Sequence, residues 1–204
     1  MLRYGLTGGI ASGKSTVAEI LREYGFPVLE ADKISHALIE PDGAAYDEVI
    51  AYFGREIVDG DGKINRKRLG KLVFADREKL EHLNRILHPR VESALQKRLA
   101  ELEQTGSFRA AFVEAALIYE AGFDRKLDGV VVAWCLPEQQ LARLMERGMG
   151  ETEARQRIAT QMPVQEKLAL AEERIDCSGS MEETRYQVEA LAARLGALPR
   201  QTER

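Results

Sequence analysis

The chain has 204 residues, 45% hydrophobic and 30% charged, which suits a soluble globular protein with one sizeable core and room for an inserted subdomain. The net charge of -4 argues against non-specific nucleic-acid binding, which usually needs a basic face. The N-terminus lacks the apolar region of a signal peptide, and no apolar run approaches the ~20 residues that span a bilayer. We therefore expect no nucleic-acid or membrane partner, a cytoplasmic location, and Cys135 and Cys177 as reduced thiols.

The first half of the chain predicts two strands and a long helical stretch. A strand is expected at 3–7, an amphipathic helix at 14–24 and a second buried strand at 27–29. The remainder, to about residue 105, has mostly helical periodicity, with helices expected at 33–39, 44–53, 66–74, 77–87 and 91–103.

The second half returns to strands. Continuous apolar runs at 110–113 and 129–134 are typical of parallel strands covered on both faces, and 174–176 predicts a short last strand. Helices are expected from Pro137, at 151–161 and at 181–195. Because no linker separates these segments, the order predicts one α/β domain with a helical insertion between its second and third strands.

A phosphate-binding loop lies between the first strand and the first helix. Gly8–Ser15 matches G-x-x-x-x-G-K-[ST] in the strand–loop–helix context that this P-loop requires. Backbone N–H groups of the turn and the helix N-terminus favour the β-phosphate of a nucleotide. Lys14 is expected to contact the β- and γ-phosphates, and Ser15 to offer its hydroxyl to the Mg²⁺ carried with ATP. The predicted ATP-binding residues of the loop are Gly9, Ile10, Ala11, Ser12, Gly13, Lys14, Ser15 and Thr16.

An acidic segment follows the second strand. In a doubly wound sheet, the carboxyl ends of the strands form the edge where ligands bind, and Glu30-Ala31-Asp32 falls there. Asp32 could accept a proton from an attacking hydroxyl, as a general base does. The alternative is that Asp32 only caps the helix expected at 33–39.

Two arginines and two histidines are further candidates. Arg143 and Arg147 lie four residues apart and share a helical face, so they could close on the phosphates, or they could form a solvated basic face. His36 lies one turn beyond Asp32 and could reach the site, whereas His88 could face a substrate or pack in a helix junction. The histidines and cysteines show no zinc-binding spacing.

The combined motifs resemble the dephospho-CoA kinase family. The similarity extends from residue 4 to about 180, in the family's order, through Gly5–Val17, Glu30-Ala31-Asp32, Leu83–Pro89, Leu117–Glu120, Gln140 with Arg143 and Arg147, and Arg157–Gln161. The resemblance implies ATP-dependent phosphorylation of the ribose 3′-hydroxyl of dephospho-CoA, the last step of coenzyme A synthesis.

The resemblance also implies a domain organisation and site roles. It implies a three-layer α/β/α P-loop NTPase fold with a parallel sheet, its core at 1–32, 106–136 and 164–204, a CoA-binding insertion at 33–105 and a lid at 137–163. The implied catalytic residues are Asp32, Lys14 and Arg143, and Arg147 would join the ATP site. Dephospho-CoA would contact Thr7, Asp32, His36 and His88. A monomer or small homo-oligomer is expected.

Three positions depart from the family pattern. Ala11 replaces the usual Gly, which the loop tolerates only if φ is negative there. Glu114-Ala115-Ala116 replaces Asp-Val-Pro, and Cys177 replaces Asn near the expected adenine edge. The alternatives are another small-molecule or nucleotide kinase with this fold, and a nucleotide-dependent switch. The chain contains no Asn-Lys-x-Asp segment for reading guanine, which disfavours the switch.

Overall fold

The computed structural model describes residues 1–196, except for the side chain of Phe74, and these form two compact units. The first unit contains residues 1–29 and the chain from residue 101 onward, and the second contains residues 30–100. The end of the core segment expected at 164–204 therefore lies outside the described residues. Each unit has its own hydrophobic core.

The first unit is built on a five-stranded sheet in the order β2-β3-β1-β4-β5. β1 is parallel to both β3 and β4, and β4 is parallel to β5. All five expected strands are confirmed, with each boundary within one residue; they are β1 Leu2–Thr7, β2 Val28–Glu30, β3 Ala110–Glu114, β4 Gly129–Trp134 and β5 Glu173–Asp176. The central strand β1 therefore ends at the residue that precedes the P-loop.

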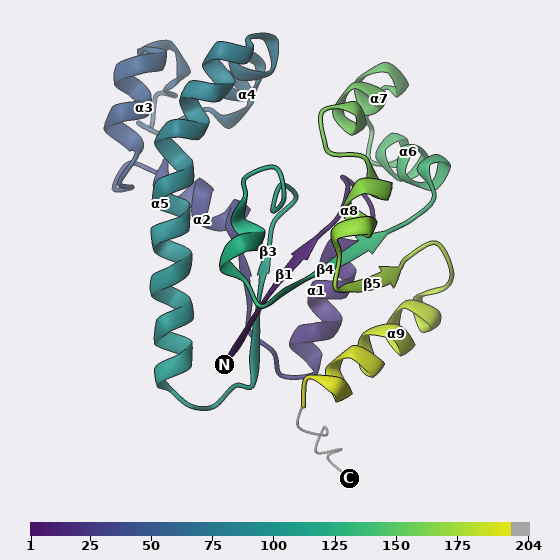
Figure 1. Cartoon of the computed structure of the whole chain (residues 1–204). Helices are drawn as coiled ribbons and strands as arrows, with labels where there is room; N and C mark the ends of the chain where they lie inside the picture. Colours follow the sequence, from purple (N-terminus) through teal and green to yellow (C-terminus); the bar gives the residue numbers. More distant parts are fainter. Residues whose placement is uncertain (197–204) are drawn as a thin grey trace. The chain divides into compact units, whose positions relative to one another are not determined.

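Helices cover both faces of this sheet. In β4, Val131 packs in the cluster that contains α1 (Lys14–Glu23) and α9 (Met181–Arg194), which lie side by side in Figure 1. The next residue, Val132, packs on the other face with Leu168 of α8 (Val164–Leu170) and with the segment around η2 (Phe123–Lys126). This alternation confirms the predicted three-layer architecture. Helix α8 was not predicted, because it is short and has a lysine on its apolar face.

The segment expected to form a lid folds into two packed helices. These are α6 (Pro137–Glu146) and α7 (Glu151–Ala159). Their apolar side chains form a small cluster with two residues of the P-loop: Ile10, Ala11, Leu141, Leu144, Met149, Ala154 and Ile158. The side chains of Leu144 and Ala154 are almost completely buried there, so this segment packs directly against the loop.

The second unit is helical. It contains α2 (Ala31–Leu38), α3 (Tyr46–Phe53), η1 (Arg55–Ile57), α4 (Arg66–Ala75) and all but the last four residues of α5 (Arg77–Gln104). Asn65 caps α4 by accepting a hydrogen bond from Arg68 N at 3.0 Å. No helix in the described part of the chain is long and apolar enough to cross a membrane.

Helix α5 corrects one prediction. Two helices were expected, at 77–87 and 91–103, because proline usually ends a helix, but α5 is one helix of 28 residues with Pro89 inside it. Proline removes an N–H and displaces the carbonyl groups of the preceding turn. Arg90 Nη1 donates to the Ile86 carbonyl, which lies in the turn before the proline, at 2.6 Å.

A buried lysine connects α8 to the start of the P-loop. The side chain of Lys167 is fully buried, with Nζ 2.8 Å from Glu120 Oε1 and 2.7 Å from the Ala116 carbonyl oxygen. The same carbonyl accepts a hydrogen bond from Thr7 Oγ1 at 3.1 Å. Lys167 was not singled out from the sequence. Its signal was its place with Val164, Leu168 and Ala171 on one helical face, where an apolar residue is the norm.

Lys167→Met should destabilise the fold by about 3 kcal/mol, because it leaves Glu120 and the Ala116 carbonyl without their buried cation. Thermal or urea unfolding would measure this loss. The control is Lys97→Met, which replaces an exposed lysine on α5 and should leave stability within ~0.5 kcal/mol. Equal stability of the two variants would contradict the structural role of the Lys167 pair.

Candidate functional site

The P-loop connects the centre of the sheet to α1. Gly13 is the N-cap of this helix, with φ of 105°, and no side chain among the described residues caps it. The first turn of α1 contains no acidic residue. The positive end of the helix is therefore not neutralised locally, and its first N–H groups lack intrahelical acceptors. Ser15 is exposed at this end and Lys14 is partly buried. The arrangement suits an anion such as a nucleotide phosphate.

Cys177 lies directly beneath the loop. A Cβ atom on Gly13 would lie 2.8 Å from Cys177 Cβ and 2.9 Å from its Sγ, so only glycine fits at this close approach. Burial raises the pKa of Cys177 to about 11 and also raises the pKa of Cys135. Both are free thiols, as predicted. The Cys177 side chain is buried under the loop.

Ala11 adopts a left-handed backbone conformation, with φ of 59°. The expectation that alanine requires a negative φ here is wrong. This conformation costs a non-glycine residue roughly 1–2 kcal/mol, so surrounding contacts must hold it. The Ala11 carbonyl accepts a hydrogen bond from Arg143 Nη1 at 3.3 Å and a weak one from Cys135 Sγ at 3.9 Å.

Arg143 belongs to the loop and not to a solvated basic face. It also donates from Nη2 to the Cys177 carbonyl at 2.8 Å, so it joins the P-loop to the segment after β5. Arg147 is exposed at the end of α6. On α7, Arg155 and Arg157 form surface ion pairs with glutamates one turn earlier. Arg143 thus contacts the loop through its side chain.

Two glutamines bind the backbone of Ile10. Its N–H donates to Gln161 Oε1 at 2.8 Å, and its carbonyl accepts from Gln140 Nε2 at 2.5 Å. Both residues contributed to the family resemblance, but no motif assigned them a role. Their side chains come from the two ends of the α6–α7 segment, and the sequence alone does not show that these ends meet the loop.

Two hydroxyl side chains in or next to the P-loop are buried, those of Ser12 and Thr7. Ser12 is 3% exposed, and its hydroxyl has no hydrogen-bond partner among the described residues. Thr7 is fully buried and donates to the Ala116 carbonyl. A substrate-binding role for the Thr7 side chain is therefore not supported, because its hydroxyl is used inside the protein.

The remaining candidates lie in the helical unit. The N-cap of α2 is Glu30, and Asp32 lies inside the first turn of this helix, so the N-cap interpretation of Asp32 is wrong. Asp32 and His36 are both exposed and lie four residues apart, on one face of α2. His36 Nδ1 lies 2.9 Å from Arg66 Nη1. His88 is on α5, where desolvation of its ring lowers its pKa.

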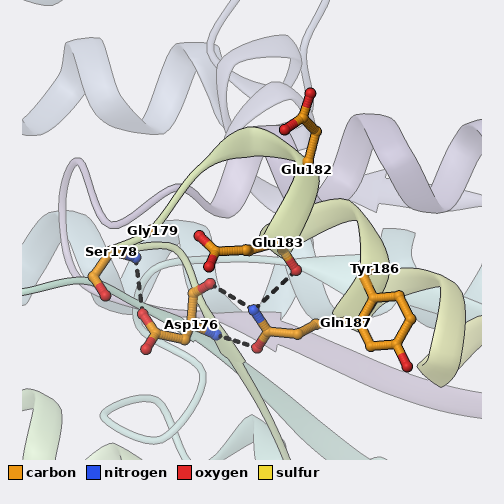
Figure 2. Close-up of a pocket in the computed structure, with 7 residues that line it drawn as sticks. All are labelled: Asp176, Ser178, Gly179, Glu182, Glu183, Tyr186 and Gln187. Atoms are coloured by element: carbon orange, nitrogen blue, oxygen red, sulfur yellow. Dashed lines mark hydrogen bonds between the residues drawn. The ribbon is translucent and has the colours of Figure 1, made fainter.

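A pocket of about 620 Å³ lies where β5 ends and α9 begins, and Figure 2 shows its lining. The Asp176 carboxylate accepts a hydrogen bond from Ser178 N at 2.8 Å, and Gln187 binds both the N–H and the carbonyl of Asp176. The lining also contains the carboxylates of Glu182 and Glu183. The three carboxylates make this pocket unsuitable for phosphate groups, so the P-loop is the better candidate for binding them. Among the described residues, no group of three or more His, Cys, Asp or Glu side chains could hold a metal ion.

Comparison with known proteins identifies the family. The sequence model described as dephospho-CoA kinase matches residues 2–183. The chain is 46% identical to the dephospho-CoA kinase of Carboxydothermus hydrogenoformans, over 90% of this chain and 89% of that protein. Its fold is similar to the crystal structure of TT1252 from Thermus thermophilus, with a TM-score of 0.80, 33% identity, and coverage of 95% and 97%. A dephospho-CoA kinase from Campylobacter jejuni aligns with a TM-score of 0.65, 27% identity, and coverage of 95% and 96%. The chain therefore belongs to the dephospho-CoA kinase family.

Proposed function

We propose that this protein transfers the γ-phosphate of ATP to the ribose 3′-hydroxyl of dephospho-CoA, giving CoA and ADP. The observation that carries the proposal is the P-loop Gly8–Ser15 at the carboxyl end of β1, in a chain whose residues 2–183 match this family. A nucleotide-dependent switch would use the same loop, so the loop alone does not distinguish the two functions. The match to the dephospho-CoA kinase family favours the kinase.

The P-loop supplies the electrostatic part of the reaction. Its backbone N–H groups and the start of α1 would bind the phosphates, and Lys14 would neutralise charge that develops on the β- and γ-phosphates. Arg143 lies close to the start of α1, because its Nη1 is 3.9 Å from the position that a Cβ atom on Gly13 would take. Its charge supports the phosphate site, while two of its donors hold carbonyl groups. Exposed Arg147 remains a candidate for contacting ATP through movement of the α6–α7 segment.

The donor set fits Mg²⁺ that arrives with ATP. Mg²⁺ usually keeps several waters and binds phosphates with one or two protein oxygens, so a dedicated cage of carboxylates is not required. Ser15 is exposed at the start of α1, and Glu114 pairs in register with Leu6, one residue before the end of β1. Ser15 would hold the ion, and Glu114 would hold one of its waters. The ion, when bound, would neutralise charge on the transferring phosphate.

Asp32 is the proposed general base. It would accept the proton of the 3′-hydroxyl as the oxygen attacks the γ-phosphorus and the bond to the leaving ADP oxygen breaks. Its support is its exposed position directly after β2 in the chain and the fact that it is not used as the helix cap. His36 and His88 are candidates for binding dephospho-CoA within the helical unit, which we propose reads the acceptor.

The proposed reaction should release ADP only with one acceptor. A coupled assay with ATP and Mg²⁺ would compare dephospho-CoA with adenosine, nucleoside monophosphates and pantetheine. Turnover is expected with dephospho-CoA, and Lys14→Ala should lower it at least 100-fold while the protein remains folded. Lys126→Ala, at an exposed lysine of the first unit, is the control. ADP release with another acceptor would refute the substrate, and acceptor-independent hydrolysis would favour a switch.

Asp32→Asn should lower the turnover number by 10²–10⁴, the usual contribution of a general base, and should leave the Kd for ATP nearly unchanged. Single-turnover rates and ATP titration would separate the two effects. A loss of under tenfold would remove Asp32 from the role of base.

Ser12→Ala should raise the stability of the nucleotide-free protein by about 1 kcal/mol, because it removes a buried hydroxyl that has no partner. The same variant should bind ATP more weakly if this hydroxyl bonds a phosphate. Thermal unfolding with and without ATP would measure both effects. Lower stability without nucleotide would contradict the first expectation.

A further inference from the structure

The P-loop carries an unusual pair of contacts at Ile10. Both backbone polar groups of this residue bind side chains from outside the loop, the N–H to Gln161 and the carbonyl to Gln140. A backbone N–H can only donate and a carbonyl can only accept. The two amides are therefore fixed in opposite orientations, with Gln161 presenting its oxygen and Gln140 its nitrogen.

The fit around Gln140 is close. A Cβ atom on Gly9 would lie 2.5 Å from Gln140 Nε2, so a side chain at residue 9 would displace this amide. Gln140 is on α6, and one turn further along this helix Leu144 is buried against Ala11. The position of Gln140 is thus set by packing, and the loop has a glycine where the amide approaches.

Gln161 is held from behind. The next residue, Met162, donates its N–H to Glu120 Oε1 at 3.0 Å. Glu120 in turn is paired with the fully buried Lys167. This chain of contacts anchors the backbone beside Gln161 to the core, so its oxygen is a fixed acceptor and not the end of a mobile surface side chain.

The loop needs such external support. Ser12 N bonds to the Gly9 carbonyl at 3.2 Å, and this turn encloses Ala11 in its strained left-handed conformation. A turn that holds strain relaxes when its contacts are removed. Relaxation would move the N–H groups that follow Ala11, which are the groups that bind phosphate.

We propose that Gln140 and Gln161 are positioning residues that hold the P-loop in its ATP-binding shape. The effect of this role on catalysis rests on the proposed function. Because they lie at the two ends of the α6–α7 segment, both ends are attached to the loop. The stretch between them also packs against the loop, through Leu144 and Ala154.

The opposite polarity of the two bonds gives a sharp test. Gln161→Glu keeps an oxygen acceptor for the Ile10 N–H, whereas Gln140→Glu loses the donor and places an anion against the Ile10 carbonyl. Both variants add one negative charge beside the same residue, so their general electrostatic effects on ATP are matched. We expect the Kd for ATP to rise at least tenfold in Gln140→Glu and no more than about threefold in Gln161→Glu.

The Kd should be measured by calorimetry without an acceptor, so the result does not depend on which acceptor is phosphorylated. Gln165→Glu, at an exposed glutamine of α8, is the charge control and should leave the Kd unchanged. If Gln140→Glu does not fold, Gln140→Met, which loses the donor without adding charge, should raise the Kd about fivefold. Equal shifts at positions 140 and 161, or none, would overturn the proposal. If the wild-type protein showed no turnover with dephospho-CoA, the proposed kinase function would be refuted. The role of the two glutamines would not be, because it is tested by the Kd for ATP.

Discussion

A loop that presents most of its N–H groups to an anion has few of those groups left to hold its own shape. This constraint explains why side chains from other parts of the first unit hold the P-loop. Its carbonyl groups bind side chains instead: Ile10 to Gln140, and Ala11 to Arg143 and Cys135. The single N–H with an outside partner in this set is that of Ile10. The loop therefore depends on residues that come from α6, from the segment after α7 and from the end of β4.

The sheet and the loop could be predicted because their signals are local. Apolar runs such as that of β4 mark strands buried on both faces, and the glycines and Lys14 of the P-loop lie within eight residues of one another. The order of these elements then gave the architecture, and the family resemblance was confirmed by the match over residues 2–183. Helix α5 was wrongly divided because proline usually ends a helix, whereas this helix continues through Pro89.

The contacts around the loop could not be predicted because they join distant residues. Gln140 and Gln161 lie 130 and 151 positions from Ile10, and nothing in their local sequence distinguishes them from surface glutamines. Arg143 was a candidate from the sequence, and its hydrogen-bond partners in the structure are protein carbonyls. The sequence left open whether Asp32 caps a helix, and the structure excludes this because α2 begins at Ala31 with Glu30 as its N-cap. Short motifs thus identify the chemistry, and the tertiary fold identifies what supports it.

The burial of the two cysteines has a practical consequence. A thiol reagent reacts with the thiolate, and with a pKa of about 11 Cys177 is ionised in only about one molecule in ten thousand at neutral pH. Cys135 is also buried and its pKa is also raised. A fluorophore or spin label can therefore be directed to a cysteine introduced on the exposed face of α7 without replacing either native residue. Such a label would report the motion of this helix in a protein whose phosphate loop is unaltered.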